Sequence, residues 1–155
     1  MYKRQYQGNL HDINHFLKVW AFAKTIGEQE GLDDQTQLTL ELAAVVHDIA
    51  CPLCRQKYGN ANGKYQELES PPLVEGFFAD MPVERDMAER ISWLVAHHHT
   101  YTHVDGLDYQ ILLEADFLVN LYEETASEHA IRQAKERIFK TKSGIRLLEE
   151  IFKIA

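Results

Sequence analysis

The segment LAAVVHDIACPL, residues 42–53, limits the possible folds of this chain strongly, because a small apolar run leads directly into His47 and Asp48. The residues before it read as one helix, with Asp33 or Asp34 as N-cap and apolar residues on all sides of its second half. A helix that is apolar on every side is buried, so His47 and Asp48 are predicted to lie near the centre of the protein. Aspartate is rarely buried without a partner, so Asp48 is expected to have one.

Helical patterns account for most of the sequence, and no stretch alternates between apolar and polar residues as a half-buried strand does. The fold class is therefore all-α, with about six or seven helices. At 155 residues the chain is expected to form one compact multi-helix domain over residues 1–155. Residues 51–63 carry loop signals, and Pro71-Pro72 is expected to break or restart the helix in that region. The predicted helices cover residues 15–31, 33–50, 65–81, 82–100, 107–124, 127–140 and 143–155.

Charge and hydropathy exclude several function classes. The net charge of −8 argues against broad nucleic-acid binding, which usually needs a basic surface. A phosphorylated substrate would therefore need local positive charge from a metal ion or from a few Lys and Arg side chains. No apolar run approaches the ~20 residues of a membrane span, and no apolar block follows the first residues as in a secretory signal. We expect a cytoplasmic protein that does not bind membranes, and the oligomeric state is left open.

Polar residues interrupt the apolar stripes of three predicted helices at His15, His47, Asp48 and Asp116. Each has an ordinary alternative: His15 as a capping or solvated residue, His47 and Asp48 as an internal hydrogen-bonded pair, and Asp116 as a salt-bridge partner. A buried carboxylate is costly unless it is paired. Together, two histidines and two aspartates suit a divalent cation such as manganese, iron, cobalt, nickel or zinc, with magnesium as a further candidate. A second His-Asp dipeptide, at residues 11–12, stands in a polar setting and is expected to contribute little.

In their order and setting, "HFLKV", "AAVVHDIA" and "LLEADFLV" resemble the HD-domain superfamily of metal-dependent phosphohydrolases. The resemblance covers a core of about residues 14–121, with C-terminal helices at about 127–155. It implies an all-α fold, hydrolysis of phosphate esters that are often nucleotides, and a metal shell of His15, His47, Asp48 and Asp116. A metal ion in such a shell binds a phosphate oxygen and lowers the pKa of a bound water. Asp48 is then the expected catalytic residue, which orients that water.

The stretch "AHHHTYTH" ends another apolar helix, and His97 and His98 match the later histidines of the family best. The alternative is a solvated helix C-terminus, where cationic side chains are mildly favoured. Gln66 stands where some family members have a further histidine ligand, so we expect about one tightly bound ion per chain. Lys18, one turn after His15, is either a contact for a small phosphorylated substrate or a solvated side chain. His97, His98 and Lys18 are thus the predicted substrate-binding residues.

The two cysteines, Cys51 and Cys54, are expected to be reduced thiols just past a helix that Pro52 terminates. A redox pair or a role in metal binding remains open for them. The main alternative to an enzyme is a catalytically silent domain of the same fold that binds a metal or senses a ligand. A thiol protein built on the two cysteines is a third and weaker hypothesis.

Overall fold

The computed structural model describes residues 9–154, and within this range the chain is helical without strands. The all-α prediction is therefore confirmed. The helices are α2 (Leu10–Glu30), α3 (Asp34–Val46), α4 (Cys51–Tyr58), α5 (Gly63–Phe78), α6 (Arg85–His97), α7 (Leu107–Glu123), α8 (Glu128–Arg137) and α9 (Lys142–Phe152).

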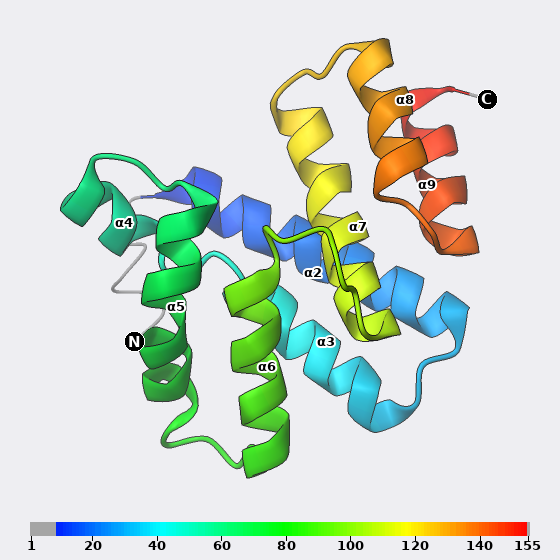
Figure 1. Cartoon of the computed structure of the whole chain (residues 1–155). Helices are drawn as coiled ribbons and strands as arrows, with labels where there is room; N and C mark the ends of the chain where they lie inside the picture. The colour runs from blue at the N-terminus through cyan, green and yellow to red at the C-terminus, as the bar shows by residue number, and fades with distance from the viewer. Residues whose placement is uncertain (1–8, 155) are drawn as a thin grey trace.

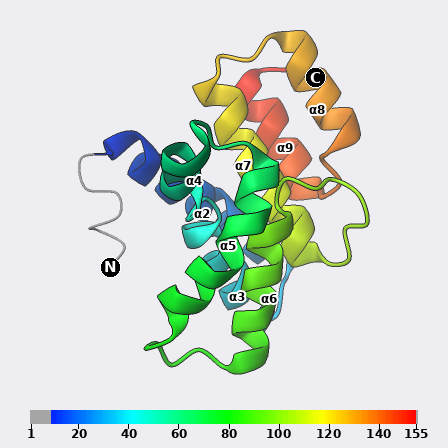
Figure 2. The ribbon, with the colours of Figure 1, turned by 60° about the vertical axis from the view of Figure 1, so that its left-hand side comes forward.

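Three helices, α2, α3 and α7, pack against one another at the centre of the protein (Figure 1). Helix α6 packs on α3 and pairs with α5, while α8 and α9 lie together at the far end of α7 from α6 (Figures 1 and 2). The apolar faces of all these helices form one core, whose residues without exposed surface include Val19, Ala23, Leu40, Ala44, Leu94 and Leu112. The polar residues predicted to be buried, among them His15, His47 and Asp116, therefore lie on or next to the three central helices.

Helix α2 begins one and a half turns earlier than the sequence predicts. The side chain of Asn9 caps it by accepting a hydrogen bond from the backbone N–H of Asp12, so the predicted start at residue 15 is wrong. Gly31 closes the helix in the left-handed conformation, with φ 74°, as a glycine C-cap does. His15 consequently lies inside α2 and not at its start.

The long helix predicted over residues 33–50 ends at Val46, and its N-cap is Asp33. Residues 47–50 form a turn, after which α4 starts at Cys51. The loop expected over residues 51–63 is therefore wrong for residues 51–58 and holds for residues 59–62. Pro52 lies in the first turn of α4, where its missing N–H costs nothing because that position has no helical acceptor. The proline starts a helix here and does not terminate one.

Helix α5 continues through Pro71 and Pro72, so the predicted break is also wrong. A proline inside a helix costs about 3 kcal/mol or more. Val74 and Phe78 are buried against the core, and this packing offsets the local cost. Helix α6 starts at Arg85, three residues after the predicted start at Pro82, and it buries an apolar face made of Met87, Ile91, Leu94 and Val95.

Among the described residues, the stretch Asp34–Tyr58 is long and apolar enough to cross a membrane by length and composition alone. In the structure it consists of α3, the turn and α4. Leu40, Ala43 and Val46 have no exposed surface. Burial in the protein core accounts for the apolar character of this stretch.

Candidate metal centre

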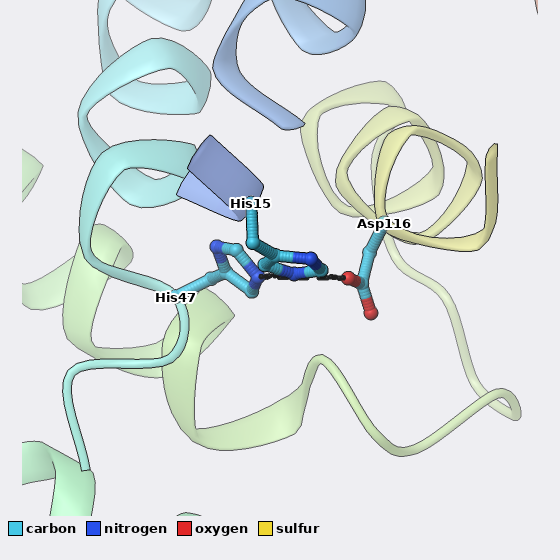
Figure 3. A group of neighbouring side chains, drawn as sticks. All are labelled: His15, His47 and Asp116. Atoms are coloured by element: carbon cyan, nitrogen blue, oxygen red, sulfur yellow. Dashed lines mark hydrogen bonds and ion pairs between the residues drawn. The ribbon is translucent and has the colours of Figure 1, made fainter. Parts of the chain in front are cut away.

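His15 from α2, His47 from the end of α3 and Asp116 from α7 point toward one another in the core (Figure 3). The two Nε2 atoms are 3.2 Å apart. Asp116 Oδ1 lies 3.3 Å from the His15 Nε2 and 3.5 Å from the His47 Nε2. All three residues are buried. His15 and Asp116 are 101 positions apart in the chain, yet the fold brings their possible ligand atoms and that of His47 within 3.5 Å of one another.

Asp48 completes the predicted set from the turn after α3. Its Oδ2 lies 3.6 Å from the Nε2 atoms of both His15 and His47. Its other oxygen, Oδ1, lies 3.3 Å from the Nε2 of His98, which follows α6. His47, Asp48 and His98 therefore form a second close group that shares His47 with the first. The Asp48 side chain is 20% exposed, so solvent reaches the centre on its side.

The ring orientations of His15 and His47 are fixed by their Nδ1 atoms. The His15 Nδ1 lies 3.0 Å from Glu123 Oε2, and the His47 Nδ1 lies 2.7 Å from the Ala44 carbonyl oxygen. A carboxylate and a carbonyl oxygen only accept hydrogen bonds, so both Nδ1 atoms carry the proton. In the neutral rings both Nε2 lone pairs then face each other and Asp116. This is the arrangement in which histidines bind a metal ion while a second group orients the ring.

The charges of the centre favour a cation. Burial opposes protonation of the His15 imidazole, but the hydrogen bond and charge of Asp116, with Asp48 and Glu123, raise the pKa of His15 to about 9. Burial also disfavours ionised carboxylates, yet the neighbouring histidines hold the pKa of both Asp48 and Asp116 below the usual range. Without a metal ion, protons on the histidines balance the buried carboxylates.

The side chains fit a divalent metal ion. Ligand atoms ~2.1 Å from a cation lie roughly 3.0 to 3.4 Å from their neighbours in an octahedral or tetrahedral shell. The separations here run from 3.2 to 3.6 Å. The His98 Nε2 is buried and makes no regular hydrogen bond among the described residues, and Asp48 Oδ1 lies 3.3 Å from it, which suits an atom that could bind a metal ion. Imidazole and carboxylate together suit manganese, iron, cobalt, nickel or zinc.

The structure separates the three residues predicted to bind substrate. His98 lies in the centre, with 1% of its surface exposed. His97 does not point there, because its Nδ1 bonds to the Trp93 carbonyl and its ring stacks on Trp93 in a groove between α5 and α6. The Lys18 Nζ lies 2.6 Å from Glu123 Oε1, on the carboxylate that also holds His15.

Asp12 is buried and paired although its sequence setting is polar, and the expectation that residues 11–12 contribute little to the site stays a prediction. It is 7% exposed and pairs with Arg55, whose Nη1 lies 2.6 Å from Asp12 Oδ2. The side chain of His11, in contrast, is 73% exposed. The spacing of three between Asp12 and His15 puts both on one face of α2, and this was the available signal. For Glu123, which lies at the end of a helix, the sequence contains no such signal.

The cysteines are free thiols, both buried, and neither belongs to the close ligand groups among the described residues. Burial and the charge of Asp48 raise the pKa of Cys51 above its ordinary value. Gln66 is also buried, and its Nε2 donates to the Ala61 carbonyl at 3.0 Å. The structure therefore brings neither thiol into the two ligand groups of this centre.

Comparison with known proteins agrees with this geometry. A family model described as HD domain matches residues 12–133. Neither a search of curated proteins nor a search of solved structures found a match. The matched range covers more than half of the chain and contains all the residues of the candidate centre, so the protein belongs to the HD-domain family.

Proposed function

We propose that this protein is a metal-dependent phosphohydrolase that cleaves a phosphate ester of a small metabolite such as a nucleotide. The observation that carries the proposal is the convergence of possible ligand atoms from His15, His47 and Asp116. The rings of the two histidines are held in place by hydrogen bonds at their Nδ1 atoms. Family membership supports the same class of reaction. His15, His47, Asp48 and Asp116 are the proposed metal ligands, with His98 as a further candidate.

A divalent cation in this centre would supply Lewis acidity toward a phosphate oxygen and would lower the pKa of a water molecule toward neutrality. Asp48 is the carboxylate on the solvent side, so it is placed to accept a hydrogen bond from the attacking water and to orient it. The Nε2 of His98 lies 3.3 Å from the other carboxylate oxygen of Asp48. Glu123 and the Ala44 carbonyl keep the two imidazoles in the ligand tautomer.

We further propose about one tightly bound ion per chain. A second ion needs its own ligands beside a shared bridge, and Asp48 offers such a bridge toward His98. The amide of Gln66 is a much poorer ligand for a transition metal than an imidazole. We therefore expect His98→Ala to impair turnover more than retention of the ion.

The test is a phosphoester screen with manganese, cobalt or nickel, with the metal content of each sample measured. Asp48→Asn should abolish hydrolysis and weaken metal retention while the helical circular dichroism spectrum is kept. Asp34→Asn is the matched control, because Asp34 is an exposed aspartate at the start of α3, far along the chain from the turn after α3 that holds Asp48. Full activity in Asp48→Asn would refute the proposal. Metal binding without hydrolysis of any ester would favour a silent or ligand-sensing domain.

A further inference from the structure

Arg55 reaches from α4 to the first turn of α2, where it meets Asp12. Its Nη1 lies 2.6 Å from Asp12 Oδ2 and its Nη2 lies 3.3 Å from Asp12 Oδ1. Asp12 is itself held, because the side chain of Asn9 donates a hydrogen bond to its Oδ2 at 2.7 Å. The guanidinium is therefore fixed by a buried carboxylate and does not move freely in solvent.

The guanidinium is connected to the elements of the candidate metal centre through Asp12 on α2 and through the start of α4. Asp12 precedes His15 by three residues on α2 and so shares its face. Arg55 follows Cys51 by one turn of α4, and the Cys51 N–H donates to the Asp48 carbonyl at 2.9 Å. The hydrogen bond to Asp12 is the main cause that raises the pKa of Arg55, and the charge of Asp48 contributes to the same shift. Arg55 is thus within electrostatic range of the proposed catalytic carboxylate.

Arg55 keeps donors for a ligand. A guanidinium has five N–H groups, and the hydrogen bonds to Asp12 use one on each Nη atom. The Nε–H and one N–H on each Nη remain, and the side chain is 48% exposed. Lys57, two residues later on the same helix, points elsewhere, because its Nζ lies 2.5 Å from Glu69 on α5.

We propose that Arg55, positioned by Asp12, binds two non-bridging oxygens of a phosphomonoester at the metal centre. Arginine recognises phosphate through two parallel N–H bonds. A phosphomonoester has three non-bridging oxygens, so one remains for the metal centre after two have bonded to Arg55, whereas a diester has only two in total. The inference rests on the proposed function and narrows its substrate class to monoesters. In a protein of net charge −8, Arg55 also supplies the local positive charge that a phosphomonoester dianion needs.

The test measures binding of inorganic phosphate to the manganese-loaded protein by calorimetry, in parallel with hydrolysis of p-nitrophenyl phosphate and its bis-ester. Arg55→Ala should weaken phosphate binding roughly 10- to 100-fold, the range for hydrogen bonds to charged groups. The phosphate affinity of Arg55→Lys should lie between those of the wild type and Arg55→Ala, because lysine keeps the positive charge and loses the two parallel hydrogen bonds. Lys57→Ala is the matched control on the same helix and should bind phosphate as the wild type does. Metal content and unfolding temperature are measured for every variant.

Asp12→Asn tests the positioning role. Loss of the fixed geometry should weaken phosphate binding about three- to tenfold and raise KM more than it lowers kcat, with partial recovery in Asp12→Glu. If Asp12 only neutralised the guanidinium, Asp12→Asn would bind phosphate more tightly, and the positioning role would be wrong. Unchanged phosphate binding in Arg55→Ala, or no binding by the wild type, would overturn the proposal. Phosphate binding that depends on Arg55 without ester hydrolysis would instead refute only the proposed enzymatic activity.

Discussion

Glu123 lies 108 positions after His15 in the chain, yet its carboxylate fixes the ring of that histidine at 3.0 Å. Such a carboxylate behind a histidine ligand raises the basicity of the ring and fixes its tautomer. Burial lowers the pKa of this ring, but the hydrogen bond and charge of Asp116, then the charge of Asp48 and the contact with Glu123, raise the pKa of His15 to about 9. In the metal-free protein His15 is therefore protonated at neutral pH.

A metal ion must displace this proton, so metal affinity should rise with pH. From pH 6.5 to 8.5 we expect the affinity for manganese to increase by up to tenfold per pH unit for each proton displaced, and to level off above pH 9. Calorimetric titrations in two buffers of different ionisation enthalpy would measure both the affinity and the protons released. An affinity that is independent of pH, with no proton release, would contradict the assignment of His15 as a ligand.

The sequence predicts the proposed ligands better than the residues around them. His15, His47 and Asp116 are polar residues inside apolar stripes, and this pattern alone requires that they have partners in the core. Arg55 and Glu123 are charged residues near helix ends, where most such residues are solvated. Their roles depend on contacts between distant parts of the chain, which no local pattern encodes.

At the scale of helices, Glu114 joins α7 to the start of α9. It has no exposed surface, and its carboxylate accepts hydrogen bonds from the backbone N–H groups of Lys140 and Thr141 and from the Thr141 hydroxyl. A Cβ at Gly144 would lie 1.9 Å from Glu114 Oε2, so glycine is required there by the close approach. One buried carboxylate thus fixes the C-terminal helices on the core.

Glu114→Ala should therefore lower the free energy of unfolding by about 2–4 kcal/mol, because it leaves buried donors without an acceptor. Urea denaturation followed by circular dichroism measures the change. Glu128→Ala is the control, since Glu128 is 67% exposed and pairs with Arg132 along α8, a contact worth about 0.3–0.5 kcal/mol. Equal stability of the two variants would show that the Glu114 contacts do not fix the C-terminal helices.

The helices themselves were predictable where an apolar stripe is long, as in α6 and α7, and less so where single residues dominate the local signal. Pro52 and Pro71 both indicated an end or a break. In the structure Pro52 lies in the first turn of α4 and Pro71 lies within α5. A proline restricts its own position and the preceding residue, but the packing of buried neighbours decides whether the helix continues.

For the molecule as a whole, the packing of α2, α3 and α7 is what brings the proposed ligands together. Each helix contributes its polar residue from a different part of the chain, so a bound cation would connect the three central helices of the fold. Binding of such a ligand only to the native state stabilises it, by about 2.7 kcal/mol at a concentration 100 times Kd. The centre and the core are therefore one structural unit.

The central claim, that two imidazoles and aspartate oxygens bind a divalent cation in this core, is tested most directly by X-ray absorption spectroscopy of the zinc- or cobalt-reconstituted protein. We predict scattering from at least two imidazole rings and from oxygen ligands at roughly 2.0–2.2 Å, without a sulfur shell at about 2.3 Å. A sulfur shell would place Cys51 or Cys54 on the metal and contradict the assignment, as would failure of the desalted protein to retain any metal.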